Sequence, residues 1–275
     1  MPILTTTISD PSGDLRTKLK QLLPSVLDRF DGLAAFVTTT THAEVFSLLD
    51  DHGVCITTGE PDFDSIGRHR RESLGLALRQ TAAEHLLFAD LDHVLRWIEI
   101  DPIELDRVLQ IICTHDCTVI GRGPRSFGSL PDRLAKTEVI VNHIYKLVTG
   151  NAWDMLMAAR GLSRGAAEVI VQYSTIDTIG NDVEWPLLCH SRGFSLQYVE
   201  AEGLIYKTNI DYALDREDSL DCDASAWATR MLIAKQHVDA MLPYATSKIE
   251  ARNTRPPSTT MQPNRGARFI PFDAK

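Results

Sequence analysis

The sequence predicts an α/β fold built on a mixed but mostly parallel central sheet, and three observations support this. In the first half of the chain, short apolar and β-branched runs alternate with longer segments of helical periodicity. The run His85–Ala89 (HLLFA) is apolar, as expected for a strand covered on both faces. The 275 residues, 44% of them hydrophobic and 24% charged, are enough for one large globular domain.

Strand–helix alternation of this kind implies right-handed crossovers between parallel strands. In the first half, the predicted strands are Ile3–Ile8, Leu33–Thr39, Val54–Thr58 and His85–Ala89. The predicted helices are Asp14–Phe30 with a kink at Pro24, His42–His52 closed by Gly53, and Gly67–Ala83. Ligands of such sheets bind at the carboxyl ends of the strands.

The second half continues with the same two kinds of element. The predicted helices are Pro102–Ile112, Pro131–Val148, Ala166–Tyr173, Val183–Ser191 and Ala224–Leu242, and the predicted strands are Cys117–Gly121 and Ser195–Glu200. From Ser247 onward the chain is polar and cannot bury enough surface to offset its ordering entropy. We therefore expect one domain over residues 1–245 and a flexible C-terminal tail over residues 246–275.

Composition excludes several classes of protein. The net charge of −9 leaves no basic surplus for nonspecific nucleic-acid binding. No apolar run approaches the roughly 20 residues that span a bilayer, and the N-terminus lacks the features of a signal peptide. The 5 cysteines lack zinc-site spacing and are expected to be isolated thiols in a reducing compartment. We expect a cytoplasmic protein without a nucleic-acid partner or a transmembrane segment.

Two aspartates, Asp90 and Asp92, directly follow the run His85–Ala89. Carboxylates at the tip of a buried strand are costly unless a positive group meets them. Three interpretations are open: a metal site for a phosphorylated substrate, a phosphoryl-transfer nucleophile, or solvated carboxylates at the start of a loop.

The nucleophile interpretation rests on a resemblance to phosphatases of the haloacid-dehalogenase type. The stretch Asp90–Leu95 resembles the motif in which the first aspartate attacks phosphorus, and Gly180–Asp182 is similar to that family's acidic motif. That motif normally opens the fold, whereas three strand–helix units precede it here. His93 and Val94 also replace the small residue and hydroxyl that usually follow.

A broader resemblance is to nucleotide-sugar glycosyltransferases of the GT-A type, family 2-like. Gly67–Leu76 resembles the family segment G-x-x-x-A-R-N-x-G that precedes the DxD motif, with Ser73 in place of Asn. Asp101–Leu109 and Thr118–Arg122 resemble the segments that follow it. The resemblance covers residues 1–210 and implies a Rossmann-type α/β/α sandwich. It departs at Thr38–Thr41, where the family usually offers the nucleotide an aspartate.

One further segment resembles the dolichyl-phosphate mannose synthase-like subgroup. Asp154–Arg164 follows the pattern D-x-x-x-G-x-R-x-x-x-R, with Ala158 in place of Gly. Asn181–Trp185 and Arg192–Phe194 resemble the acidic motif and the turn that come next. The subgroup resemblance implies transfer with inversion of configuration.

The resemblance implies a divalent cofactor, Mg²⁺ or Mn²⁺, held by Asp90 and Asp92 against the donor diphosphate. Such a cation serves as Lewis acid and template, and hard cations prefer oxygen ligands. The resemblance assigns Asp92 to the metal and Asp90 to the metal or the nucleotide. The remaining donor-binding residues are predicted to be Ser9, Asp10, Arg68 and Arg71. The two arginines lie at a helix start, where free backbone N–H groups favour the binding of an anion such as a diphosphate.

The acceptor side of the predicted site is carried by the second half of the chain. Asp182 stands at the general-base position of the family, with Glu184 as the nearest substitute. Arg160, Arg164 and Trp185 are the predicted acceptor- or phosphate-binding residues. If the acceptor is already a phosphate, no strong base is required and Asp182 would orient the acceptor.

The predicted function is therefore metal-dependent sugar transfer from a UDP- or GDP-linked donor to an unknown acceptor, which can be a small molecule, a glycan or a lipid phosphate. Three alternatives stay open: a nucleotidyltransferase, the dehalogenase-type phosphatase with Asp90 as nucleophile, and a non-catalytic nucleotide-sugar-binding protein. The sequence leaves a homo-oligomer open.

Overall fold

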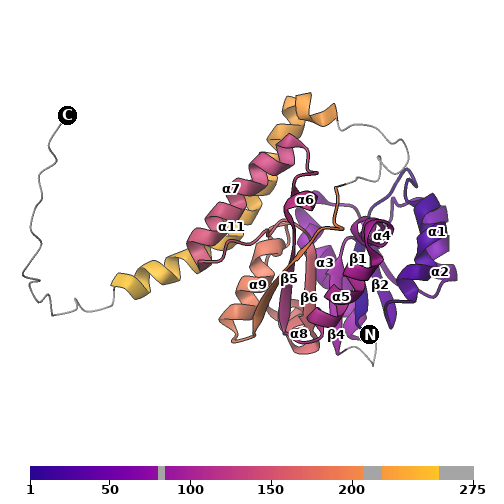
Figure 1. Cartoon of the computed structure of the whole chain (residues 1–275), viewed down its shortest axis with the longest axis horizontal. Coiled ribbons are helices and arrows are strands. Elements are labelled where there is room, and N and C mark those ends of the chain that lie inside the picture. The colour runs from indigo at the N-terminus through magenta and orange to yellow at the C-terminus, as the bar shows by residue number, and fades with distance from the viewer. Residues whose placement is uncertain (80–83, 207–218, 254–275) are drawn as a thin grey trace, which may run out of the picture.

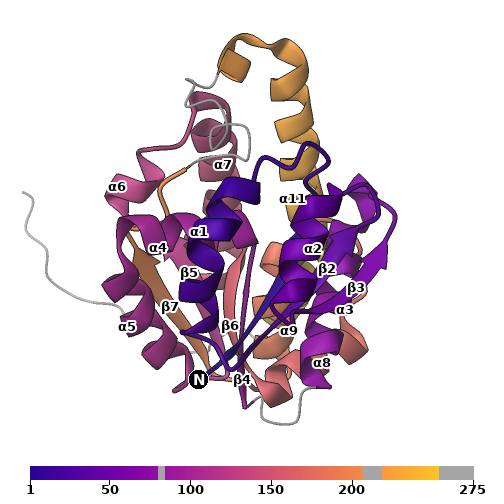
Figure 2. The same ribbon diagram turned by 90° about the vertical axis from the view of Figure 1, so that its right-hand side faces the viewer.

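The computed structural model describes residues 1–79, 84–206 and 219–253, and its centre is a seven-stranded sheet (Figures 1 and 2). The strands are β1 Ile3–Ile8, β2 Gly32–Thr38, β3 Cys55–Gly59, β4 His85–Ala89, β5 Cys117–Arg122, β6 Ala159–Ser163 and β7 Leu196–Ala201. Their order is β3-β2-β1-β4-β6-β5-β7. Strand β6 pairs antiparallel with both β4 and β5, whereas the other neighbours are parallel. The predicted mixed, mostly parallel sheet is confirmed.

Helices cover both faces of this sheet. They are α1 Arg16–Leu27, α2 Ala43–Asp51, α3 Ile66–Leu78, α4 Leu91–Ile100, α5 Pro102–Ile112, α6 Pro124–Phe127, α7 Asp132–Thr149, α8 Arg164–Tyr173, α9 Asn181–Ser191 and α11 Ala224–Asn253, with short 3₁₀ turns at Phe63–Ser65 and Ser219–Cys222. Apolar residues of α1, α2, α4 and α5 form one core with the sheet, and those of α3, α8 and α9 form a second. The result is the predicted α/β/α sandwich.

Alternate residues of the central strands supply the two cores. In β4, Leu87 and Ala89 join the core under α1 and α4, while Leu86 and Phe88 join the core under α3 and α9. Side chains of a strand point alternately to opposite faces, so a strand buried on both sides must be apolar at every position. This explains why the run before Asp90 carries no polar alternation.

Most elements match the predicted ranges, whereas α4, α6 and β6 were not predicted. Strands β1 and β4 and helix α5 have the predicted bounds. Helix α4 begins directly after Asp90, where the start of a loop was one of the interpretations. Strand β6 lies within Asp154–Arg164, the segment that resembles the transferase subgroup. Helix α11 continues to Asn253, so the first residues of the predicted tail are helical. Residues 80–83 at the end of the third predicted helix, and residues 254–275 of the tail, lie outside the described residues.

Helices α7 and α11 run along each other and extend past the sheet (Figure 1). Arg122 at the end of β5 donates to both carboxylate oxygens of Asp154, at 2.7 and 2.9 Å, and also to Glu138 of α7. Glu138 in turn accepts from Arg230 of α11 at 2.7 Å. This buried charge network fastens both long helices to the sheet. Within the described part of the chain, no helix is both long and apolar enough to cross a membrane.

Candidate functional site

The strand order creates a crevice at the carboxyl ends of β1 and β4. From β1 the chain moves outward to β2 and β3, and it then returns to the other side of β1 as β4. Ligands of open α/β sheets bind where the strand order reverses, because the loops on the two sides diverge there. Ser9 and Asp10 leave β1 at this point, and Asp90 and Asp92 leave β4.

Two adjoining cavities open at this edge and share Thr7, Ile8, Ser9 and Ile66. One, of about 290 Å³, is lined by Asp90, Asp92 and Arg70 among others, and we call it the acidic cavity. The other, of about 210 Å³, is lined by Phe36, Pro61, Phe63 and His69 among others, and we call it the aromatic cavity. The two cavities form one groove with a charged end and a mostly apolar end.

The hydroxyl groups of Ser9 and Thr38 lie at one wall of the aromatic cavity. Thr38 Oγ1 donates to Ser9 Oγ at 3.2 Å and lies 3.0 Å from Thr41 Oγ1 and 3.3 Å from Thr40 Oγ1. These threonines occupy the end of β2, where the resembled family offers an aspartate. At this wall the groove therefore presents neutral donors and acceptors, and the acid among the lining residues of the aromatic cavity is Asp62.

Asp90 and Asp92 lie at the start of helix α4. Asp90 is the N-cap residue and Asp92 belongs to the first turn, where a carboxylate interacts favourably with the helix dipole. Their side chains are 25% and 23% exposed. Burial, together with the charge of Asp90, raises the pKa of Asp92 against the opposing charge of His93. No group of three or more metal-ligating side chains occurs in the ranges that the structure describes.

Arg70 is the cation of the acidic cavity. Its guanidinium is 3% exposed, lies 5.2 Å from the centre of the Phe88 ring, and donates to Asp182 Oδ1 at 2.6 Å and Asn181 Oδ1 at 3.1 Å. A longer contact of 3.4 Å joins Arg70 to Asp90 Oδ2, whose other oxygen accepts from Thr7 at 3.2 Å. Arg70 therefore links the carboxyl end of β4 to the start of α9.

Asp182 is buried between two donors. Its side chain, 4% exposed, accepts from Arg70 on one oxygen, and His237 Nε2 of helix α11 lies 3.2 Å from the other. Burial alone would raise the pKa of Asp182, but the charge of Arg70 and the hydrogen bond from His237 outweigh it and hold this pKa below its usual value. The carboxylate is stabilised in its charged form and faces neither cavity.

Two glycines permit this close arrangement. A Cβ atom on Gly67 of α3 would lie 2.4 Å from the carbonyl oxygen of Thr178, and one on Gly180 would lie 2.5 Å from that of Gln236 in α11. Both contacts are with backbone, which cannot swing aside as a side chain can. The absence of a Cβ lets α3 and α11 approach the start of α9 closely enough for Arg70 and His237 to reach Asp182.

Glu184 and Trp185 point into the interior of the protein. Burial raises the pKa of Glu184 to about 7, although Ser174 Oγ donates to it at 2.8 Å. Trp185 is 1% exposed and meets the ring of Phe88 edge-on, at 5.4 Å between ring centres. Trp185 contributes to the core under α3, α8 and α9.

The two predicted donor-binding arginines of α3 lie away from the groove. Arg68 is exposed and donates to Ser65 Oγ at 3.0 Å. Arg71 donates to the carbonyl oxygen of Ile176 at 2.5 Å and pairs with Asp177. These two contacts attach α3 to the connection between α8 and α9. Neither lines the two cavities.

Of three further predicted residues, two are hydrogen-bonded to backbone groups and one lies far from the groove. Asp10 accepts from the N–H groups of Asp14 and Leu15, at 2.9 and 3.0 Å, and so binds the start of α1. Arg160 is buried and donates to four carbonyl groups, including that of Asp182 at 2.8 Å. Arg164 follows Ser163, which pairs with the first residue of β4, so it lies at the opposite edge of the sheet from Asp90.

The structure thus brings Ser9, Asp90 and Asp92 together and adds Arg70 and His237, which sequence reasoning missed. A signal for Arg70 existed in the helical period, because the buried residues of α3 include His69, Arg70, Ser73, Leu74 and Ala77. Arg68 and Arg71 fall outside this spacing. His237 gave no comparable signal, since its partner lies 55 positions away.

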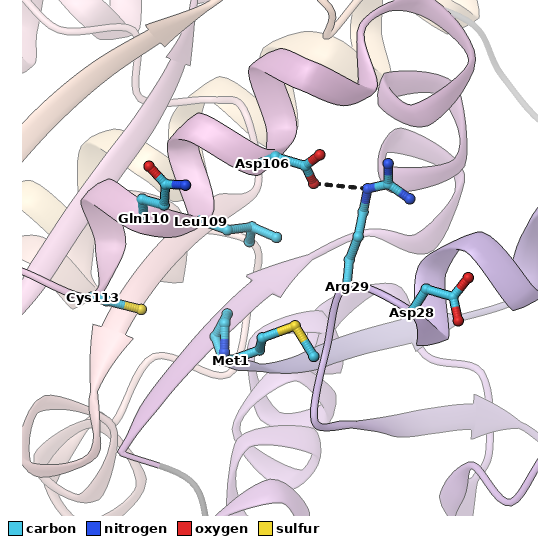
Figure 3. Close-up of a pocket in the computed structure, with 8 residues that line it drawn as sticks. Met1, Asp28, Arg29, Asp106, Leu109, Gln110 and Cys113 are labelled. Atoms are coloured by element: carbon cyan, nitrogen blue, oxygen red, sulfur yellow. Dashed lines mark hydrogen bonds and ion pairs between the residues drawn. The ribbon is translucent and has the colours of Figure 1, made fainter.

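A larger cavity of about 630 Å³ lies near the amino ends of β1, β2 and β5, and Figure 3 shows the residues that line it. Met1, Asp28, Asp106, Leu109 and Cys113 line it, and Arg29 reaches across to Asp106 at 2.9 Å. Met1 precedes β1, Asp28 and Arg29 lie between α1 and β2, and Cys113 lies between α5 and β5, so they mark the amino ends of these strands, whereas Asp106 and Leu109 belong to α5. The cavity is therefore separate from the groove that contains Asp90.

Comparison with solved structures supports the fold. The chain is similar to glucosyl-3-phosphoglycerate synthase from Mycobacterium tuberculosis in complex with uridine diphosphate, with a TM-score of 0.55 and 12% identity over 90% of this chain and 80% of that one. The same enzyme with Mg²⁺ and uridine diphosphate gives 0.52 and 11%, over 90% and 79%. Its complex with Mn²⁺, UDP-glucose and phosphoglyceric acid gives 0.51 and 11%, over 90% and 80%.

No model of a known protein family matches the sequence, and no curated protein matches it either. At this level of identity the structural likeness establishes the fold. The chain has the α/β/α architecture of GT-A-type glycosyltransferases, as the sequence predicted.

Proposed function

We propose that this protein is a metal-dependent glycosyltransferase that takes a sugar from a UDP-linked donor. The observation that carries the proposal is the two-ended groove at the strand-order reversal, with a mostly apolar aromatic cavity beside an acidic one. A nucleoside diphosphate has the same division into a planar base and a charged diphosphate. The neighbours of the same fold that were solved with uridine diphosphate and Mg²⁺ or Mn²⁺ support this choice of donor and cofactor.

The residues of the acidic cavity fit a divalent cation that arrives with its substrate. Asp90 and Asp92 offer two partly exposed carboxylates, and Mg²⁺ commonly uses one or two carboxylates plus substrate phosphates and waters. Charge favours the same ion, because Arg70 is already paired with Asp90 and Asp182, so Asp92 and an incoming diphosphate leave an excess of negative charge in the cavity. When bound, the cation supplies Lewis-acid stabilisation of the departing diphosphate.

The chain's own residues position the donor around that charge. We assign Arg70 to orient Asp90 through the 3.4 Å contact and to supply positive charge beside the acidic cavity. Thr7 fixes the other oxygen of Asp90 at 3.2 Å, and Ser9 offers a hydroxyl group at the junction of the cavities. These contacts pre-set the carboxylate, so little reorganisation is needed when the donor binds.

The catalytic base stays a prediction. Asp182 is bound on both oxygens by Arg70 and His237, so we assign it first to the positioning of Arg70. This assignment agrees with an acceptor that needs no strong base, such as a phosphate group. Glu184, with a pKa near neutrality but a buried side chain, is the remaining candidate base.

A second candidate function is a nucleotide-sugar-binding protein without transferase activity. The burial of Asp182 favours this second function. Asp182 stands at the general-base position of the resembled family, but its side chain is 4% exposed, is paired with Arg70 and lines neither cavity. The two functions differ in turnover. A transferase releases free UDP from UDP-sugar in the presence of an acceptor or slowly with water, whereas a binder leaves the donor intact.

The test of the proposal is calorimetric titration of the full chain with UDP, with and without Mn²⁺. We expect binding that requires Mn²⁺ and that is lost in Asp92→Asn, which keeps the size of the side chain and removes its charge. Asp51→Asn, at an exposed position on α2, is the matched control and should bind as the unaltered chain does. Absence of UDP binding with Mn²⁺, or equal binding by the Asp92 variant, would refute the proposal.

A further inference from the structure

His69 lines the aromatic cavity without an internal partner. Its side chain is 6% exposed, and no residue in the described part of the chain makes a hydrogen bond to either ring nitrogen. Neither ring nitrogen belongs to the fully enclosed polar atoms that lack a partner, so the imidazole is open to the cavity, where water or a ligand can pair with it.

The ring of His69 is held in place by packing. It stacks on Phe36 of β2, with 4.1 Å between ring centres and 10° between planes. Gly59 of β3 leaves room for Phe36, since a Cβ atom there would lie 2.7 Å from Phe36 Cζ. The imidazole is therefore fixed in orientation before any ligand arrives.

The charge state of His69 suits a neutral ligand edge. Burial lowers the pKa of His69, and the charge of Arg68 lowers it further against the opposing charges of Glu72 and Asp62. A neutral imidazole has one N–H donor and one acceptor nitrogen. It can therefore accept a hydrogen bond from a ligand N–H or donate one to a ligand carbonyl group, and it does not require an anionic ligand.

We propose that His69 is a specificity-determining residue that hydrogen-bonds the edge of the donor's base, a uracil, inside the aromatic cavity. The inference rests on the proposed function and adds to it the residue that recognises the base. The volume of about 210 Å³ lies below the range of about 300–1,000 Å³ usual for drug-sized ligands, which favours a single ring. Uracil offers an N–H flanked by carbonyl groups, so either tautomer of His69 finds a partner.

The geometry of the groove agrees with this assignment. Phe63, Pro61 and Ile66 supply apolar surface for the faces of a planar ring, while His69 supplies the polar contact at its edge. The cavity shares Thr7 and Ser9 with the acidic cavity, so a base beside His69 would direct its diphosphate toward Asp90 and Asp92.

The test compares UDP with inorganic pyrophosphate, each titrated with Mn²⁺ into the full chain and into His69→Phe. Phenylalanine keeps the ring stack on Phe36 and removes both ring nitrogens. Loss of one hydrogen bond should weaken UDP binding about three- to tenfold, whereas pyrophosphate, which has no base, should bind equally to both chains. His143→Phe, at an exposed position on α7, is the matched control.

Nitrogen NMR of the unaltered chain provides a measurement that does not depend on the folding of a variant. UDP should shift the ring-nitrogen resonances of His69, and pyrophosphate should leave them in place. Equal UDP affinity in His69→Phe, equal weakening of both ligands, or unmoved His69 resonances with UDP bound would overturn the inference while leaving the proposed function intact. If the unaltered chain binds neither ligand with Mn²⁺, the proposed function fails and the inference fails with it.

Discussion

Removal of the Arg70 guanidinium should destabilise the protein strongly. In Arg70→Met the apolar stem is retained, but Asp182 loses its 2.6 Å partner while remaining buried. Breaking a buried ion pair by deleting one member costs about 3–5 kcal/mol. The 3.4 Å contact with Asp90 adds little, because that carboxylate is 25% exposed and solvent screens it.

This cost is large enough to measure by urea unfolding. For a domain of this size about 1 kcal/mol lowers the Tm by roughly 2–4 °C, so we expect a fall on the order of 10 °C. Arg68→Met is the matched control, since Arg68 lies two positions earlier on the same helix and is exposed. It should change stability by no more than about 0.5 kcal/mol.

A double-mutant cycle separates the ion pair from other effects of the Arg70 substitution. Arg70→Met combined with Asp182→Asn removes both charges, so the double variant should be less destabilised than the sum of the two single variants by at least about 1 kcal/mol. The reasoning is refuted if Arg70→Met costs no more than Arg68→Met, or if the two single costs simply add.

The remaining predictions concern the other buried groups near α9. Because burial raises the pKa of Glu184 from 4.5 to about 7, the folded chain holds a proton there that the unfolded chain has released, and stability falls as the pH rises across that interval. Glu184→Gln keeps a partner for Ser174 and removes this loss of stability. In urea unfolding the variant should be more stable than the unaltered chain above pH 7, by at most about 3 kcal/mol, and equally stable near pH 4. A constant difference at all pH values would contradict the assignment. Gly180→Ala should lower the Tm sharply, because its Cβ would lie 2.5 Å from the carbonyl oxygen of Gln236. Gly75→Ala is the control and should be neutral or stabilising by up to about 1 kcal/mol, because its Cβ would meet only the Val171 side chain at 3.8 Å. Equal behaviour of the two variants would contradict the packing argument.

The fold was largely predictable because its signals are local. The apolar run of β4 and the helical period of α5 each identify an element without reference to the rest of the chain, and both bounds agree with the structure. Strand β6 gave no such signal, because its five residues include Arg160 and Gly161 and its strand partners are β4 and β5. Its antiparallel pairing depends on contacts that are remote in sequence.

Helix α4 was missed for a different reason. Two aspartates after a strand suggest a metal-binding loop, yet the same residues at the N-cap and in the first turn are favourable at the start of a helix. Both properties belong to Asp90 and Asp92 at once. The sequence motif therefore identified the location of the candidate site without identifying the element that carries it.

The candidate site was predictable where strands end and unpredictable where burial decides. Asp90, Asp92 and Ser9 follow from the topology of a parallel sheet, and they line the groove. The choice of Arg70 over Arg68 depends on which side of α3 faces the sheet, and the burial of Asp182 depends on His237 from a distant helix. Such contacts are set by tertiary packing rather than by a local pattern.

The central claim is that one groove holds the base at His69 and the metal-bound diphosphate at Asp90 and Asp92. A crystal structure of the full chain with UDP and Mn²⁺, using the anomalous signal of manganese, tests it most directly. The claim predicts a manganese peak in contact with the carboxylates of Asp90 and Asp92 and a uracil ring beside His69. UDP bound elsewhere, for example in the cavity beside Arg29, or a manganese peak remote from both aspartates, would contradict it.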